Sequence, residues 1–221
     1  MTDFPYSDKR QLLVDNLRNS HVIKSEEVYE AMLQVPRHQF VSKTKQPNAY
    51  HDTPLQIGEG QTISAPHMNA MMCEYLSITP GQKILEIGTG SGYHAALVGM
   101  LVGKNGQVFT MERFPKLANK AKRIFLKLGY SNIEVIVKDG TLGYEKEAPF
   151  DRILVTAAGP EIPQALLNQL SPHNGIMCIP VGQRRSYQKL LVINKNGDQF
   201  EQHTVCSVIF VPLIGEQGFS N

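Results

Sequence analysis

The decapeptide Ile84-Leu85-Glu86-Ile87-Gly88-Thr89-Gly90-Ser91-Gly92-Tyr93 joins an apolar strand to the start of a helix through three glycines at alternate positions. Glycines in such a turn let the main chain approach a ligand closely, and the N–H groups at a helix start suit an anionic group. The spacing is G-x-G-x-G, which differs from the G-x-G-x-x-G of dinucleotide-binding proteins, and the Glu86 carboxylate comes just before the turn. The segment predicts a ligand that carries a positive group rather than a pyrophosphate; the alternative is a tight turn with no ligand.

The composition is that of one ordinary globular domain. The chain has 221 residues, of which 42% are hydrophobic and 19% charged. A net charge of +2, with scattered Lys and Arg, argues against a nucleic-acid partner. Cys73, Cys178 and Cys206 lie far apart without a C-x-x-C pair, so neither a disulfide frame nor a metal site is expected. No signal-peptide h-region and no run near the roughly 18 apolar residues of a membrane span is present, which favours a cytoplasmic protein without a membrane partner.

From residue 83 onward, strand-like and helical patterns alternate. Strands are predicted at 83–87, 107–111, 133–137, 152–156, 176–181, 189–193 and 205–212, with helices after Gly92, Pro115 and Pro160. This order predicts an α/β fold with a doubly wound, mostly parallel sheet, and Asn196-Gly197 signals a hairpin that makes the C-terminal part antiparallel.

The residues before this sheet are predicted to form helices and a long loop. Ser25 is expected to cap a helix that ends at Pro36, and 36–61 is expected to be a loop of the kind that carries function. Another helix is expected to start at Pro66.

Acidic side chains follow three successive predicted strands. Glu86 precedes the glycines, Glu112 follows the second strand, and Asp139-Gly140 follows the third. In a doubly wound sheet these strand ends share one edge, where ligands bind. Glu112 is suited to accept from both hydroxyls of a ribose, and Asp139 from an adenine amino group. Each acid alone is more simply a solvated strand end, but their joint placement predicts a nucleoside site.

Five segments, in order along the chain, resemble the protein-L-isoaspartate (D-aspartate) O-methyltransferases, a family of class I S-adenosylmethionine-dependent methyltransferases. The segments are Asp52-Thr53-Pro54-Leu55-Gln56-Ile57-Gly58, Gln61-Thr62-Ile63-Ser64-Ala65-Pro66-His67-Met68, the decapeptide 84–93, Thr156-Ala157-Ala158 and Val208-Ile209-Phe210-Val211-Pro212-Leu213. The match extends from about Ser7 to Phe219. Asn69 stands where the family often has His, and Phe219 where it often has Trp, so the contact at Asn69 is open.

The resemblance implies a Rossmann-like methyltransferase fold and methyl transfer from S-adenosylmethionine to the free α-carboxyl of L-isoaspartyl, and possibly D-aspartyl, residues of damaged proteins. S-adenosylhomocysteine is the implied product, no metal is needed, and a monomer is expected. The implied organisation is 1–65 for the N-terminal helices and active-site loop, 66–187 for the cofactor-binding core and 188–221 for the C-terminal strands.

The expected site residues follow from these motifs. Ser64 is the expected catalytic residue, which hydrogen-bonds and aims the substrate carboxyl. The expected cofactor-binding residues are Thr62, Glu86, Gly88, Gly90, Gly92, Glu112, Asp139 and Gly140, and the expected substrate-binding residues are Ile63, Ser64, Val211 and Pro212.

Other interpretations stay open from the residues alone. Ser64 could instead cap the helix that starts at Pro66, and 205–212 could be a core strand with no substrate contact. At the level of function, the rivals are a nicotinamide-dependent oxidoreductase, which the glycine spacing disfavours, and a binding module that has lost methyl transfer.

Overall fold

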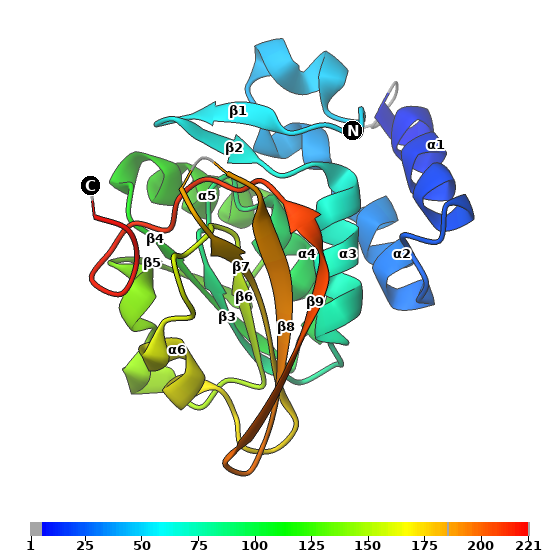
Figure 1. The fold of residues 1–221 in the computed structure, drawn as a ribbon. Helices are drawn as coiled ribbons and strands as arrows, with labels where there is room; N and C mark the ends of the chain where they lie inside the picture. Colours follow the sequence, from blue (N-terminus) through cyan, green and yellow to red (C-terminus); the bar gives the residue numbers. More distant parts are fainter. Residues whose placement is uncertain (1–5, 185, 221) are drawn as a thin grey trace.

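The computed structural model describes residues 6–184 and 186–220 and shows a seven-stranded sheet with helices on both faces (Figure 1). The strands are β3 (Lys83–Ile87), β4 (Gln107–Glu112), β5 (Ile133–Val137), β6 (Arg152–Val155), β7 (Gly175–Gly182), β8 (Gln188–Asn196) and β9 (Gln199–Val208). Their order is β5-β4-β3-β6-β7-β8-β9, parallel from β5 to β7 and antiparallel thereafter. The predicted doubly wound sheet with an antiparallel C-terminal part is confirmed.

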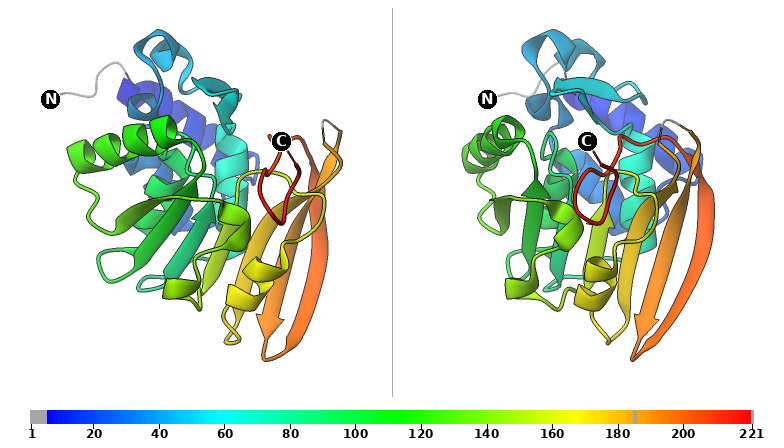
Figure 2. Two further views of the ribbon diagram at one scale, coloured as in Figure 1. Left: turned by 90° about the vertical axis from the view of Figure 1, so that its left-hand side faces the viewer. Right: turned by 60° about the vertical axis from the view of Figure 1, so that its left-hand side comes forward.

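The central strand β3 is buried on both faces of the sheet. Ile84 contributes to a core with the helices that lie within residues 6–128, whereas its neighbour Leu85 contributes to a core on the opposite face, beside the short helix at 164–169 (Figure 2). Successive side chains of a strand point to opposite faces, so a parallel strand covered on both sides reads as a continuous apolar run. Burying a Leu or Ile side chain fully contributes about 1.5–3 kcal/mol, which makes β3 a firm base for the loop that follows it.

The helices follow the local signals in the sequence. They are α1 (Tyr6–Asn19), α2 (Glu26–Gln34), α3 (Pro66–Leu76), α4 (Tyr93–Val102), α5 (Pro115–Leu128) and the short α6 (Gln164–Gln169). The Ser25 hydroxyl accepts a hydrogen bond from the Val28 N–H, which confirms the predicted N-cap. Prolines begin α3 and α5, where a missing N–H costs nothing.

The segment 36–61 is more ordered than the predicted loop. It contains the 3₁₀ helices η1 (Arg37–Phe40) and η2 (Lys43–Asn48) and the strand β1 (Leu55–Gly58), which pairs with β2 (Gln61–Ile63). Arg37 and Phe40 have no exposed surface, so their contacts with the core stabilise a segment that has little helical or strand periodicity. The prediction of a loop is therefore wrong for most of this segment.

The last strand also differs from the prediction. β9 begins at Gln199, six residues before the predicted start of the strand, and ends at Val208. The two-residue turn Gly197-Asp198 connects it to β8, as the Asn-Gly signal indicated, with Gly197 at a φ of 59°. Beyond Val208 the chain leaves the sheet and passes Ala158, whose N–H donates to the Val211 carbonyl at 2.8 Å. This departure places 211–214 over the carboxyl ends of the parallel strands.

Candidate active site

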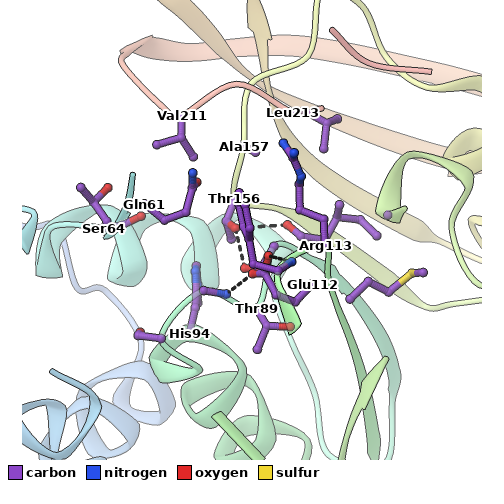
Figure 3. A pocket seen from close by; sticks show the side chains of 18 of the residues that line it. Gln61, Ser64, Thr89, His94, Glu112, Arg113, Thr156, Ala157, Val211 and Leu213 are labelled. Carbon is purple, nitrogen blue, oxygen red and sulfur yellow. Dashed lines mark hydrogen bonds between the residues drawn. The ribbon is translucent and has the colours of Figure 1, made fainter. Parts of the chain in front are cut away.

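A cavity of about 220 Å³ opens at the carboxyl ends of β3, β4 and β6. Four stretches form most of its wall, namely residues 61–64, 87–91, 111–114 and 211–214. Single contributions come from Asn69, His94, Gly140, Thr156, Ala157 and Arg184. Figure 3 shows Glu112 and Thr89 at the base, with Ser64 and Gln61 on one side, Arg113 on the other, and Val211 and Leu213 above. The cavity lies where the strand order reverses, the usual binding position in doubly wound sheets.

The glycine loop after β3 has a backbone that other residues could not adopt without strain. Gly88, Gly90 and Gly92 all have positive φ, at 98°, 53° and 88°. A Cβ on Gly88 would lie 2.3 Å from Thr156 Oγ1, which donates a hydrogen bond to the Gly88 carbonyl at 2.8 Å. Gly88 and Gly90 line the cavity, whereas Gly92 faces Phe125 of the core. Of the three glycines of this loop that were expected to bind the ligand, the structure brings two to the cavity.

The Glu112 carboxylate connects the end of β4 to the glycine loop. One oxygen accepts from the Gly90 N–H at 2.8 Å and the other from the Phe114 N–H at 3.0 Å. Burial raises the pKa of Glu112, although these two main-chain donors oppose the shift. Glu112 lines the cavity, as expected.

Glu86 lies below the cavity and does not line it. Its side chain has no exposed surface, one oxygen accepts from the Thr110 hydroxyl, and Oε1 has no hydrogen-bond partner among the described residues. Burial raises the pKa of Glu86 to about 8. Thr110 Oγ1 lies 2.7 Å from Thr89 Oγ1, so the hydroxyls of Thr89 and Thr110 stand between this carboxyl and the loop. The structure places Glu86 beneath the cavity, and its expected contact with the ligand stays a prediction.

Asp139 also lies outside the cavity wall, although its neighbour Gly140 is part of it. Asp139 Oδ1 accepts from the N–H and the hydroxyl of Thr141, both at 2.8 Å, and Oδ2 accepts from the Glu216 N–H at 2.8 Å. The carboxylate therefore holds the C-terminal segment against the end of β5. Local pattern does not show that Glu216 returns to this strand, and the expected adenine contact of Asp139 stays a prediction.

Ser64 lies at the junction of two cavities. A second cavity of about 370 Å³ adjoins the first, and both are lined by Thr62, Ser64, Thr156 and Val211. The N-cap of α3 is Ala65, which has no capping side chain, and Asp52 instead accepts from the His67 N–H at 2.9 Å. The capping role considered for Ser64 is therefore wrong. Its hydroxyl has no hydrogen-bond partner among residues 6–184 and 186–220.

The second cavity is bounded by the end of β9 and the chain beyond it. Its lining includes residues 207–211 together with Pro54, Met68 and Tyr187. Ile209 and Tyr187 are 70% and 75% exposed, so the rim offers apolar surface to solvent. Of the expected substrate-binding residues, Ser64 and Val211 line this cavity, whereas Ile63 and Pro212 line the first one only.

Several wall residues were not among the expected site residues. His94 is buried, its pKa is lowered to about 3 by burial, and its Nε2 lies 3.4 Å from Cys73 Sγ. His94 is therefore neutral at physiological pH and is not a general acid. A polar residue in the first turn of the otherwise apolar helix 93–102 was the available signal. Thr89, Arg113 and Thr156 flank predicted strand ends, a position that could have identified them.

Comparison with known proteins identifies the family. The family model described as protein-L-isoaspartate(D-aspartate) O-methyltransferase matches residues 8–218. The chain belongs to this family. It is 52% identical over 217 residues to protein-L-isoaspartate O-methyltransferase 2 of Archaeoglobus fulgidus, covering 98% of this chain and 97% of that protein. It is 52% identical over 214 residues to the protein-L-isoaspartate O-methyltransferase of Methanopyrus kandleri, with 95% and 93% covered.

A solved protein-L-isoaspartate O-methyltransferase has the same fold. The Plasmodium falciparum protein, crystallised in complex with S-adenosyl-L-homocysteine, matches with a TM-score of 0.82 and 30% identity over 93% of this chain and 98% of its own. The Rossmann-like methyltransferase fold implied by the sequence is thereby confirmed. Among the described residues, no helix is long and apolar enough to cross a bilayer, and no cluster of three or more metal-ligating side chains occurs.

Proposed function

We propose that this member of the protein-L-isoaspartate O-methyltransferase family transfers a methyl group from S-adenosylmethionine to the free α-carboxyl of L-isoaspartyl residues in damaged proteins. The observation that carries the proposal is the pair of adjoining cavities that meet at Ser64 and Thr156. The first suits a nucleoside at the strand ends, and the second suits an extended polypeptide. A reaction between a cofactor and a protein side chain needs both, with a shared wall.

The donor set of the first cavity fits S-adenosylmethionine, a ligand with hydroxyls, a cationic centre and an amino-acid end. Glu112 supplies an anion, Arg113 a cation, and Thr89, Ser91 and Thr156 supply hydroxyls. The main chain forms the wall directly at three glycines, Gly88, Gly90 and Gly140. Thr62 lies in the wall that the first cavity shares with the second. Once bound, this cofactor supplies a methyl group on a positively charged sulfur, whose charge is neutralised as the methyl leaves.

The substrate carboxyl needs orientation and no general base. A carboxyl of reference pKa near 4 is already ionised at neutral pH. In the first cavity the one histidine among the lining residues, His94, stays neutral because burial lowers its pKa to about 3. Ser64 lines both cavities, which supports the assignment of its hydroxyl as the hydrogen-bond donor to this carboxylate. Orientation of reacting groups alone can lower a barrier by about 7–11 kcal/mol.

The second cavity suits a substrate read mainly through its main chain. The segment 207–211 continues from an edge strand, and Val211 lies between the two cavities. Main-chain pairing gives affinity and tolerates varied side chains. An enzyme that acts on one abnormal linkage in many sequence contexts requires this tolerance.

Methyl labelling of matched peptides tests the function. The protein is incubated with S-adenosylmethionine labelled at the methyl group and with two peptides that differ only in an isoaspartyl or a normal aspartyl linkage. Label is expected in the isoaspartyl peptide and not in its partner, and the ester should be base-labile. A third peptide with a D-aspartyl residue defines the breadth of the substrate class. Equal labelling of the first two peptides, or none, would reject the proposal.

A further inference from the structure

Arg37 is a buried cation at the start of η1. Its side chain has no exposed surface, although arginine is among the residues least often fully buried. No ion pair joins it to a carboxylate of residues 6–184 or 186–220. Burial lowers the pKa of Arg37 to about 10, so the guanidinium is still charged at neutral pH. Burying a charge without a contacting anion costs free energy, so the hydrogen bonds of this guanidinium are expected to serve a function that offsets the cost.

The guanidinium joins three separate segments. Nε donates to the Ala49 carbonyl at 2.9 Å, Nη1 to Asn69 Oδ1 at 3.3 Å, and Nη2 to the Ser64 carbonyl at 2.7 Å. The Tyr93 ring lies against it, with Cζ 4.9 Å from the ring centroid. When the Asn69 side-chain amide is flipped, the bond from Arg37 to Asn69 is lost, and the Asn69 nitrogen donates to the Ser64 carbonyl at 3.3 Å. In both orientations, polar side chains fix the main chain at Ser64.

The shortest of these bonds ends on the residue whose hydroxyl is free. The Ser64 side chain lines both cavities but has no hydrogen-bond partner among the described residues, so its direction depends on its own main chain. Arg37 holds that main chain from behind and is not part of either cavity wall. A charge-assisted bond to a carbonyl is stronger than a neutral one and suits this role.

We propose that Arg37 is a positioning residue for methyl transfer, which fixes the Ser64 main chain so that the serine hydroxyl stays aimed at the junction of the two cavities. This inference rests on the proposed function of Ser64. It predicts that Arg37 contributes to turnover only through Ser64. Lysine cannot replace it, because one ammonium group lacks the planar fork that reaches the diverging carbonyls of Ala49 and Ser64.

Arg152 provides a matched control. It begins β6 and is also buried, and its guanidinium donates to the carbonyls of Leu76, Ser77 and Asn174. It lines neither cavity. Arg152→Lys therefore tests what the loss of a buried guanidinium does to the enzyme when Ser64 is not its partner.

A double-mutant cycle tests the proposal with the isoaspartyl peptide. We expect Arg37→Lys to lower kcat about tenfold, with S-adenosylhomocysteine affinity changed less than twofold, whereas Arg152→Lys leaves kcat within twofold. In the Ser64→Ala background, Arg37→Lys should lower kcat less than twofold, because the hydroxyl it positions is gone. Arg37→Gln, which keeps an amide donor, is measured beside it in case the lysine variant fails to fold.

Two results would overturn the inference. One is a fall in kcat by the same factor with Ser64 present and absent, which would mean that Arg37 acts on the fold in general. The other is full kcat in a folded Arg37 variant. Wild-type protein that methylates no isoaspartyl peptide would refute the proposed function instead, so the two failures are distinct.

Discussion

The Glu112 carboxylate accepts a hydrogen bond from the Gly90 N–H at 2.8 Å, so that the acid that ends β4 holds the glycine loop that follows β3. The two neighbouring strands therefore build one wall of the cavity as a unit. Because Glu112 shapes this wall and carries its negative charge, replacing it should change cofactor affinity more than peptide affinity.

Replacing Glu112 should weaken cofactor binding. In Glu112→Gln the amide oxygen can still accept from one of the two main-chain N–H groups, those of Gly90 and Phe114. The amide NH₂ faces the other N–H, which therefore loses its acceptor. A hydrogen bond to a charged group is worth about 1.5–3 kcal/mol, so S-adenosylhomocysteine affinity should fall about tenfold to hundredfold. Titration calorimetry measures it, with Glu134→Gln, an exposed carboxylate of β5, as the control. An affinity within twofold of wild type would show that Glu112 does not shape the site.

Gly88→Ala should disrupt the loop by a contact as well as by backbone strain. The added Cβ would lie 2.3 Å from Thr156 Oγ1 at a φ of 98°. Gly129→Ala is the matched control, because Gly129 also has positive φ, at 79°, but nothing lies within 4 Å of its added Cβ. The control should lose about 1 kcal/mol of unfolding free energy, and Gly88→Ala more, together with cofactor binding. Urea unfolding compares them; equal losses would mean that Thr156 moves aside freely.

Ser64→Ala should lower turnover and leave stability unchanged. Because Ala65 is the N-cap of α3, the loss of the Ser64 hydroxyl removes no helix cap. Unfolding free energy should stay within about 0.5 kcal/mol, whereas Ser25→Ala, which removes a true cap, should lose about 1 kcal/mol. The labelling assay should show a lower kcat at unchanged S-adenosylhomocysteine affinity. Full turnover by the folded variant would exclude a role for this hydroxyl.

The buried Glu86 makes stability depend on pH. Its pKa rises from an ordinary value of 4.5 to about 8 in the folded protein. Between these pH values the folded state keeps a proton on Glu86 that the unfolded chain has lost. The contribution of Glu86 to the free energy of unfolding is therefore full below about pH 4.5 and is lost as pH rises through about 8. The slope is at most about 1.4 kcal/mol per pH unit.

Glu86→Gln removes this titration. The variant should therefore gain stability relative to wild type when both move from pH 5 to pH 8, as measured by urea unfolding. Glu134→Gln, which removes an exposed carboxylate, should follow wild type at both values. A constant difference between Glu86→Gln and wild type at the two pH values would show that the carboxyl is already ionised in the folded protein.

The sequence predicted those parts of the fold that depend on local pattern. The apolar run 83–87 coincides with β3, Ser25 caps α2, and the Asn-Gly signal lies at the β8–β9 turn. Glu112 was placed correctly at the cavity because a strand end in a parallel sheet has a known position. These features need only the residues near them.

The remaining features depend on contacts between distant segments. Nothing near Arg37 shows that Ala49, Ser64 and Asn69 surround it, so its segment was predicted as loop. Asp139 is engaged by Glu216, 77 residues further along the chain. Such pairings follow from how the layers pack, which periodicity does not report.

The segment 211–214, held over the cavity by Ala158 and followed by the Glu216 contact with Asp139, has a consequence for biosynthesis. Every parallel strand precedes it in the chain. A nascent polypeptide could therefore complete the parallel sheet from β3 to β7 while the upper wall of its site is still inside the ribosome. Methyl-transfer competence is thus acquired only after that sheet has been made.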